Sequence, residues 1–277
     1  MTTSSVLSSH RDSVDSVVSS PKYSLVVSSD REHREIAQRL RYQVFASEPG
    51  FSVPENDQGI DADRFDGFCD HLLVRHDVTG EFVGCYRMLP PDAARAAGGY
   101  YTATEFDISA LAPEANRIVE MGRACVTSDH RSGSVLSLMW AGILQYLQLT
   151  GYEWVMGCVS VPMQEAPDSS VGSNVRGVRD QLLRKYGNDP DRRVTPYRPV
   201  VVDGKGLDDL EPPAKVSVPP LLRGYLRLNA KICGEPAHDP DFGVADFVAI
   251  LGLHETNHRY LDRLRSASAN LETGSLG

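Results

Sequence analysis

The sequence of 277 residues has no apolar run near the ~20 residues that span a bilayer, so it does not predict a transmembrane helix. Residues 1–21 are rich in Ser and lack the positively charged start and apolar stretch of a secretory signal. We predict a disordered leader over residues 1–21, one domain over residues 22–265 and a flexible tail over residues 266–277.

Paired cysteines and an excess of basic charge are also missing. The five cysteines are scattered, odd in number and form no C-x-x-C pair, which favours a reduced, cytoplasmic protein. The formal net charge of −9 argues against nucleic acid as a partner. It also disfavours a global attraction to an acidic carrier protein or an anionic membrane, so either contact needs a local basic patch.

Hydrophobic periodicity predicts one mixed α/β domain without internal repeats. A helix capped by Asp30 carries Ile36, Leu40, Val44 and Phe45 on one face. The other predicted helices span residues 92–97, 135–149, 174–186, 221–228 and 254–264. The predicted strands span residues 23–27, 71–75, 82–89, 117–126, 154–160 and 245–251, of which the second and third form a hairpin.

The stretch 117–160 reads as strand, polar turn, apolar helix and parallel strand, joined by a right-handed crossover. Its first strand carries Glu120 and Arg123, which strand parity places on opposite faces. A core strand seldom holds charges unless they are paired or functional. Glu120 is therefore either part of a structural ion pair, with Arg87 as a candidate partner, or a base that deprotonates an amine.

An acidic loop precedes this unit, with Asp57, Asp61, Asp63, Asp66 and Asp70 in a segment that lacks clear periodicity. Three interpretations stay open for it. The loop is a solvated acidic segment, a ring of carboxylates around a cationic substrate such as an amine, or a Ca²⁺ site. Its spacing does not match the twelve-residue calcium loop.

The turn at residues 128–134 lies between the charged strand and the apolar helix. Arg131, Gly133 and Ser134 would let a phosphate approach the free N–H groups at the start of that helix. The turn matches neither the G-x-x-x-x-G-K-[ST] nor the G-x-G-x-x-G pattern, so it does not indicate binding of a nucleoside triphosphate or a dinucleotide.

Three further residues or motifs are better explained structurally. His254-Glu255-Thr256-Asn257-His258 matches the zinc motif H-E-x-x-H, but few residues follow that could supply a third ligand, so we predict no metal. His71 is a second choice of base and more typical of a buried structural histidine. Cys125 follows the charged strand without an activating charge, which favours a core cysteine.

Several separated motifs, in order, resemble the GNAT-fold acyltransferases of ornithine-lipid synthesis, some of which are labelled hemolysin-like. Their order is also similar to that in acyl-homoserine lactone synthases, and the resemblance covers most of residues 22–251. The motifs are Arg41-Tyr42-Gln43-Val44-Phe45-Ala46-Ser47-Glu48, Asp61-Ala62-Asp63-Arg64-Phe65-Asp66, His71-Leu72-Leu73-Val74, Gly84-Cys85-Tyr86-Arg87, Glu120-Met121-Gly122-Arg123, Leu138-Met139-Trp140, Gly157-Cys158-Val159-Ser160, Pro220-Leu221-Leu222-Arg223-Gly224-Tyr225 and Asp239-Pro240-Asp241-Phe242.

The resemblance implies an α/β GNAT-type fold with a C-terminal elaboration, and strands at 117–126 and 154–160 that splay to admit a pantetheine arm. It implies transfer of a fatty acyl group, often 3-hydroxylated, from an acyl carrier protein to an amino-acid amine such as that of ornithine, giving a lyso-lipid amino acid. Glu120 matches the general base, and no cofactor is tightly bound. The residues that match the acceptor side are Asp63, Asp66, Arg41, Arg87 and Arg123.

The phosphate turn departs from the pattern of acetyl-CoA-using relatives, because only Arg131 and Gly133 remain of it. This favours a carrier-protein donor over acyl-CoA. The alternatives are an acyl-CoA-dependent enzyme or a lactone synthase, which the long C-terminal region disfavours. A further alternative of another class is a lytic protein at a membrane surface, in which residues 221–228 lie at the lipid interface. An acyltransferase at the inner face of the membrane, in peripheral contact with it, is also compatible with the resemblance.

Overall fold

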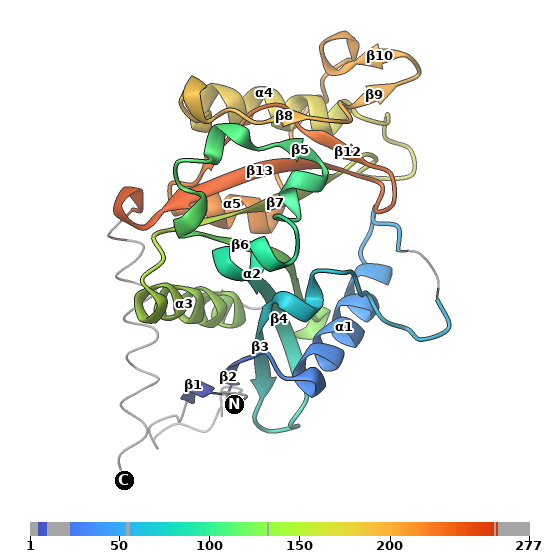
Figure 1. The fold of residues 1–277 in the computed structure, drawn as a ribbon. Helices are drawn as coiled ribbons and strands as arrows, with labels where there is room; N and C mark the ends of the chain where they lie inside the picture. The colour runs from blue at the N-terminus through green and yellow to red at the C-terminus, as the bar shows by residue number, and fades with distance from the viewer. Residues whose placement is uncertain (1–4, 10–22, 54–55, 132, 258, 260–277) are drawn as a thin grey trace.

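A computed structural model describes residues 5–9, 23–53, 56–131, 133–257 and 259 of the chain (Figure 1). The backbone is built on a nine-stranded sheet in the order β1-β2-β3-β4-β6-β7-β13-β11, with β12 also paired to β13. Every neighbouring pair is antiparallel except β6 and β7. The sheet strands are β1 (Ser5–Ser9), β2 (Tyr23–Ser28), β3 (Asp70–His76), β4 (Phe82–Leu89), β6 (Ile118–Val126), β7 (Trp154–Pro162), β11 (Lys231–Ile232), β12 (Ala237–Asp239) and β13 (Val244–Gly252).

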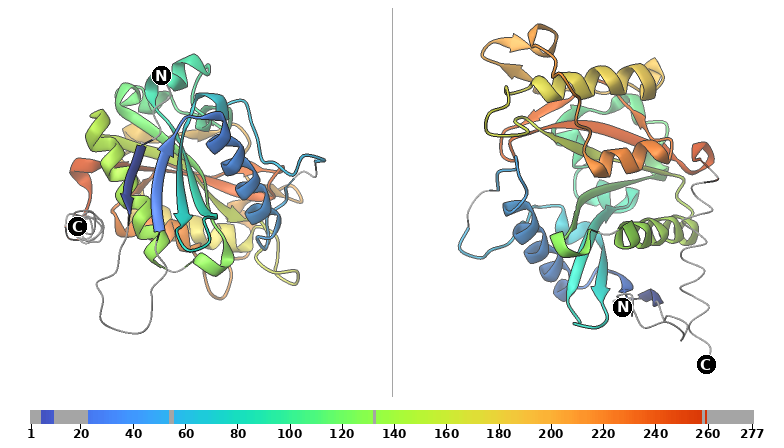
Figure 2. Two further views of the ribbon diagram at one scale, coloured as in Figure 1. Left: turned by 90° about the horizontal axis from the view of Figure 1, so that it is seen from below. Right: turned by 180° about the vertical axis from the view of Figure 1, so that it is seen from behind.

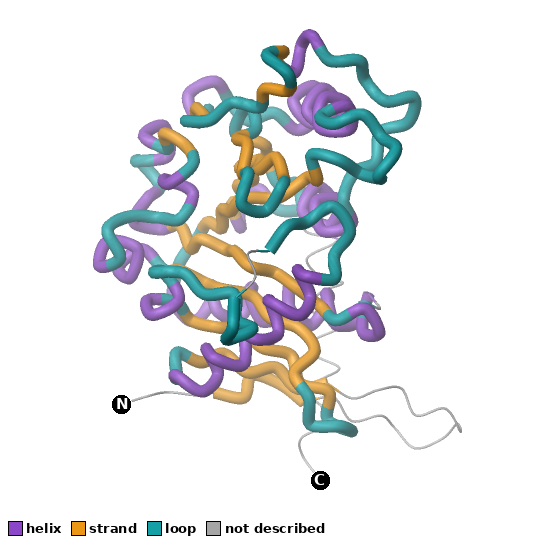
Figure 3. The backbone as a smooth tube through the Cα atoms, turned by 90° about the vertical axis from the view of Figure 1, so that its right-hand side faces the viewer, coloured by secondary structure: helices purple, strands orange, loops and turns teal. Residues whose placement is uncertain are grey.

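Helices cover both faces of this sheet, and most loops lie at the periphery (Figure 3). Two small antiparallel pairs, β5 (Phe106–Asp107) with β8 (Thr195–Pro196) and β9 (Val201–Val202) with β10 (Lys205–Gly206), lie outside it. None of the helices that the structure describes is both long and apolar enough to cross a membrane. The α-helices are α1 (Arg31–Ala46), α2 (Pro91–Ala96), α3 (Gly133–Thr150), α4 (Ser173–Tyr186) and α5 (Pro220–Arg227).

In the first half of the sheet, α1 and α3 pack on opposite faces (Figure 2). Leu40 and Val44 of α1 contact the face that carries Leu73 and Cys85. The apolar helix α3 packs on the other face, against a core that includes Leu72. Because successive strand residues point to opposite faces, adjacent residues of β3 enter different cores.

In the second half, β7 and β13 pair along their whole length and are covered on both sides. Val175, Val178 and Leu182 of α4 pack on the face of β13 that carries Phe247. The opposite face contacts α2 and the segment around Phe106, within another buried cluster. All nine residues of β13 are buried, which makes a charged residue within it costly unless it is paired or functional.

The predicted elements between residues 23 and 251 are confirmed, with bounds that differ by a few residues. Asp30 occupies the N-cap position of α1, but its side chain makes no capping hydrogen bond. The predicted leader is wrong at β1, whose residues pair with β2; its other positions and the tail lie outside the described residues. The last predicted helix, over residues 254–264, begins too early, since a 3-10 turn ends at Glu255 and the next two residues are not helical. Arg259 is helical, and the remaining positions lie outside the described residues.

Candidate active site

Strands β6 and β7 separate after a short parallel contact. They pair only where Ile118–Glu120 lies beside Trp154–Met156, and β7 then continues along β13. Gly157 lies at the point of separation, where a Cβ atom would be 2.1 Å from the carbonyl oxygen of Met121. This confirms the splayed strands that the resemblance implies, and it opens a gap in the middle of the sheet.

A β-bulge in β6 directs the charged residues of the strand. Between the pairs Cys85–Cys125 and Arg87–Gly122, β6 has one residue more than β4, and Arg123 adopts a left-handed conformation with φ of 52°. The bulge cancels the alternation of side chains, so Glu120 and Arg123 line the same cavity. The prediction that strand parity places them on opposite faces is therefore wrong.

The gap between β6 and β7 opens into a cavity of about 480 Å³. Part of its wall is apolar, with contributions from β4, β6, β7, α3 and α5. A smaller cavity of about 30 Å³ shares several of these side chains and is also bordered by Trp140 and Ala230. The apolar lining residues include Tyr86, Met121, Leu136, Met139, Val159, Leu221 and Tyr225, and the polar ones include Arg87, Glu120, Arg123, Arg131, Ser160, Asp239 and Asp246.

Glu120 is 5% exposed and is held by the turn that follows α2. Its Oε1 accepts hydrogen bonds from the backbone N–H and the hydroxyl of Thr102, at 2.7 and 2.5 Å, and its Oε2 accepts one from the N–H of Tyr101 at 2.7 Å. Burial raises the pKa of Glu120, while these donors act in the opposite direction. No cation of the described residues forms an ion pair with it, so the alternative of a structural ion pair with Arg87 is wrong.

Three arginines and three aspartates form a buried network beside the cavity. Both terminal nitrogens of Arg41 bind the carboxylate of Asp66 at 2.9 Å, and its Nε lies 2.8 Å from Asp61. Arg87 binds Asp63 at 2.7 Å and Asp66 at 3.2 Å. Arg123 completes the network, 3.2 Å from Asp61 and 3.3 Å from Asp63. The three positive and three negative charges of this Arg–Asp network balance one another.

The prediction that the acidic loop forms an open ring of carboxylates around a cationic substrate is therefore wrong, because arginines of the same chain occupy that position. Arg87 and Arg123 line the cavity, whereas Arg41, Asp63 and Asp66 are not among its lining residues. Although burial raises the pKa of Asp66, the hydrogen bonds and charge of Arg41 hold it well below its ordinary value. The geometry supports a positioning role for Arg41, Asp63 and Asp66, and the three arginines also disfavour Ca²⁺ there.

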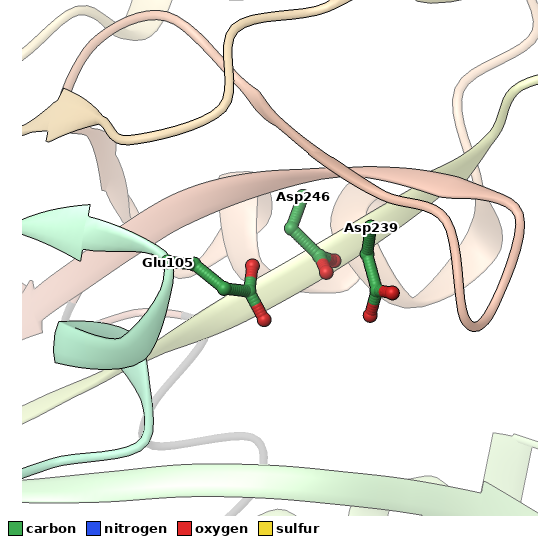
Figure 4. A group of neighbouring side chains, drawn as sticks. All are labelled: Glu105, Asp239 and Asp246. Carbon is green, nitrogen blue, oxygen red and sulfur yellow. The ribbon is translucent and has the colours of Figure 1, made fainter.

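A second acidic group, Glu105, Asp239 and Asp246, was missed by the sequence analysis. Carboxylate oxygens of the three residues lie within 4.8 Å of one another, and Figure 4 shows their side chains converging. Asp246 is 3% exposed and accepts a hydrogen bond from Ser160 at 2.6 Å, across the β7–β13 pair. One signal could have found it, because Asp246 is a single charge within the apolar run Val244–Gly252.

The phosphate-facing turn lies at the end of β6. It forms a 3-10 turn at Ser128–His130, and α3 then begins at Gly133 and Ser134. Arg131 lines the cavity and is half exposed. Its guanidinium forms an ion pair with Glu48 and donates to the carbonyl of Val126 at 3.1 Å. The predicted Arg131 thus reaches the cavity, and a phosphate would compete with Glu48 for it.

The residues and motifs that the sequence analysis set aside have structural environments. His71 is 1% exposed, and burial lowers its pKa to about 4, so it is a neutral core histidine near Asp66. The Sγ atoms of Cys125 and Cys85 lie 3.4 Å apart, and the pKa of the Cys125 thiol is raised by this contact and by burial. His254 packs edge-on against Trp154, and His258 lies outside the described residues.

The splayed parallel strands, the bulge and the cavity between them define an acyltransferase of the GNAT fold. The Acetyltransferase (GNAT) domain family matches residues 40–141. The solved structure of FeeM, an N-acyl amino acid synthase from uncultured soil microbes, shares the fold with a TM-score of 0.50 and 12% sequence identity. That match covers 85% of this chain and 93% of the other.

Two relatives identify the family. The L-ornithine N(alpha)-acyltransferase of Brucella abortus is 32% identical over 250 residues, which cover 85% of this chain and 86% of that protein. The enzyme of the same name from Rhizobium meliloti is 31% identical over 242 residues, which cover 82% and 79%. The chain belongs to the L-ornithine N(alpha)-acyltransferase family.

Proposed function

We propose that this enzyme transfers a fatty acyl group from an acyl-carrier-protein thioester to the α-amine of ornithine, giving a lyso-lipid amino acid. The observation that carries the proposal is the cavity of about 480 Å³ at the splayed strands, with an apolar wall and a charged wall. The names of the relatives support ornithine as the acceptor. An acyl chain, often 3-hydroxylated, suits the apolar wall, and an amino acid suits the charged wall.

Glu120 is the proposed general base. An ammonium group must lose a proton before its nitrogen can attack a thioester, so a carboxylate positioned at the cavity assists the reaction. Oε2 accepts one hydrogen bond, which leaves it able to accept a proton from the amine or from a bridging water. Burial raises the pKa of Glu120, which strengthens it as a base.

The proposed reaction is direct attack of the amine on the thioester carbonyl, without a covalent intermediate on the enzyme. The C–N bond forms first and gives a tetrahedral intermediate, and its collapse breaks the C–S bond. The nitrogen loses a proton and the departing thiolate takes one up, so the products are an amide and a free thiol. In the described part of the sheet, β7 has no partner on its β6 side beyond Met156. Backbone N–H groups on that edge of β7 can stabilise the oxyanion of the tetrahedral intermediate.

The donor enters between β6 and β7 in this proposal, with its pantetheine arm in the gap. Arg131, with the start of α3 at Gly133 and Ser134, would hold the phosphate that links pantetheine to its carrier. Only Arg131 and Gly133 remain of the glycine-rich pattern that suits the longer phosphate chain of CoA. This supports a carrier protein as donor, and the chemistry requires no tightly bound cofactor.

The residues that the structure describes do not favour the alternative of a lytic membrane-surface protein. Apolar side chains of α5 and of its C-cap residue Leu228 face the interior. Leu222 and Leu228 are fully buried, and Tyr225 packs edge-on against Trp140. An amphipathic helix at a lipid interface would instead present such side chains to the outside.

A panel of acyl-carrier-protein and acyl-CoA donors, each combined with single amino acids, tests the proposal. Thiol release and the mass of the product are followed together. We expect thiol release to require both a donor and ornithine, with N-acyl-ornithine as the product and faster turnover from the carrier protein. Faster turnover from acyl-CoA would overturn the donor assignment. Leakage of liposome contents without any donor would overturn the enzyme assignment.

A further inference from the structure

We propose that Glu105, Asp239 and Asp246 bind the side-chain ammonium of the acceptor, and so restrict the enzyme to amino acids that carry a second amine. This inference rests on the proposed function, because it assigns the part of the acceptor that does not react. We call the three residues the acidic triad. They come from three separate elements, namely the end of the 3-10 turn Thr102–Thr104, β12 and β13.

The acidic triad lacks the counter-ions that buried carboxylates need. Among the described residues, no Lys, Arg or His nitrogen lies within 4.0 Å of its carboxylate oxygens, although the nearby Arg–Asp network has one arginine for each aspartate. Asp246 is 3% exposed and accepts a hydrogen bond from the neutral hydroxyl of Ser160. Oε2 of Glu105 is fully enclosed and accepts no hydrogen bond. An incoming cation with several N–H groups would satisfy these acceptors.

An ammonium fits the acidic triad better than a metal ion. The –NH₃⁺ group has three donors, one for each carboxylate that converges in Figure 4. Calcium takes six to eight oxygen ligands, more than three carboxylates that each supply one oxygen. The charge of Arg123 also acts on Glu105 and Asp246, which disfavours a divalent ion more than a single positive charge.

The position of the acidic triad suits an amino acid whose α-amine reacts at Glu120. Asp239 and Asp246 line the same cavity as Glu120, and Glu105 is not a lining residue but has a carboxylate oxygen within 4.8 Å of theirs. Strand β7 connects the two groups. The hydroxyl of Thr102, which donates to Glu120, lies 3.7 Å from the Sγ of Cys158. Two residues further along β7, Ser160 donates a hydrogen bond to Asp246. Two residues of a strand span about 7 Å, a distance that a short dibasic amino acid can bridge.

Arg123 supplies a recognition point for the carboxylate of the same acceptor. Its guanidinium lies 5.1 Å from the centre of the Tyr101 ring and 4.9 Å from that of Phe242, and it lines the cavity. The amine to be acylated, the carboxylate and the second ammonium would then each face a different group of the cavity. Such three-point contact selects for both the length and the charge of the acceptor.

The experiment compares ornithine with norvaline, which has the same carbon chain but lacks the second amine. In Asp246→Asn, kcat/KM for ornithine should fall by about 10- to 100-fold, as expected for a lost charge-assisted hydrogen bond, while the value for norvaline changes little. Asp241→Asn, at an exposed position in the turn between β12 and β13, is the matched control and should behave as the wild type. An equal loss with both acceptors would overturn the inference.

Binding measurements separate this inference from the proposed function. Calorimetry with the wild-type enzyme and no donor should show tighter binding of ornithine than of norvaline, and Glu105→Gln and Asp246→Asn should abolish the difference. Failure of acyl transfer with normal selective binding would overturn only the proposed function. Non-selective binding by a folded wild-type enzyme, or an Asp246-dependent rise in Tm with CaCl2 but not with ornithine, would overturn the acidic triad as an ammonium site.

Discussion

The carboxylate of Glu120 combines a structural contact with a proposed chemical role. Its bonds to Tyr101 and Thr102 fix the turn that ends at Glu105, so one side chain connects the proposed base to the acidic triad. Burial and hydrogen bonding have opposite effects on its pKa. A single donor can therefore be removed to test whether the titration of Glu120 controls the rate.

Thr102→Val removes the hydroxyl donor and keeps the shape of the side chain. Because that bond stabilises the charged carboxylate, its loss should raise the pKa of Glu120 further. The base works only when deprotonated, so the acid limb of the pH profile of kcat should move to higher pH. Thr104→Val is the control, since that hydroxyl donates to the carbonyl of Tyr101. If the acid limb of a folded Thr102→Val enzyme does not move, Glu120 is not the base.

At the scale of secondary structure, the separation of β6 and β7 depends on two local irregularities. The bulge at Arg123 turns a charged side chain into the cavity, and Gly157 permits the last close contact before the strands diverge. The close contact and the gap lie next to each other along β7. A side chain at Gly157 would therefore disturb the region where the thioester is proposed to bind.

Gly157→Ala should lose about 1–3 kcal/mol of stability, because the new Cβ would overlap the carbonyl oxygen of Met121 and the backbone must shift. Gly224→Ala in α5 is the matched control, since nothing lies within 4 Å of its added Cβ. Alanine is favoured over glycine within a helix, so that variant should gain about 0.5–1 kcal/mol. Urea denaturation measures both changes, and equal stabilities would contradict this account of Gly157.

Across the whole molecule, carboxylates occur in two contrasting environments beside one cavity. The aspartates of the Arg–Asp network have arginine partners, whereas the acidic triad has none among the described residues. The net charge of −9 therefore does not describe the site, where the unbalanced negative charge is local and partly buried. This difference has a consequence for the pH dependence of stability.

Burial raises the pKa of Glu105 to about 8 and that of Asp246 to about 6. The charge of Asp239 also raises both pKa values, and the charge of Asp246 raises that of Glu105. Arg123 lowers both pKa values, Tyr101 lowers that of Glu105, and hydrogen bonds from Ser160 and Glu105 lower that of Asp246. At a pH between the ordinary pKa of a carboxyl group and these raised values, the folded state binds more protons than the unfolded state. These two groups therefore make the protein less stable as pH rises through that window.

Thermal unfolding of wild type and Glu105→Gln at pH 6.5 and 8.5 tests this prediction. As the pH rises from 6.5 to 8.5, the wild type should lose stability relative to the variant, by at most ~1.4 kcal/mol per pH unit. Two other groups affect stability at lower pH. In the folded state His71 titrates below this range, and the stability that comes from the lowered pKa of Asp66 is lost only in acid. Ornithine should reduce the difference by supplying a cation. If the stabilities of the two proteins change equally with pH, the pKa of Glu105 in the folded state is not raised.

Much of the fold followed from local pattern, because strands and helices have distinct hydrophobic periods. The apolar run of α3 and the two short apolar runs of the β3–β4 hairpin predicted elements that the structure contains. Resemblance added the splayed strands, and it matched Glu120, already singled out by its charge on a core strand, to a general base. The prediction from strand parity failed at Arg123, because one extra residue in a strand reverses the faces to which the following side chains point. Such a bulge leaves no trace in the composition of the sequence.

Residue types and hydrophobic periods along the chain were enough to indicate a mixed sheet, a central apolar helix and a strand that carries Glu120. They could not show which carboxylates face an arginine and which face a cavity. Asp66 and Asp246 are both buried aspartates, yet the first is held by Arg41 and the second has no cationic partner among the described residues. That difference arises from contacts between residues far apart in the chain, because Coulomb interactions depend on distance in space and on burial, not on separation in sequence.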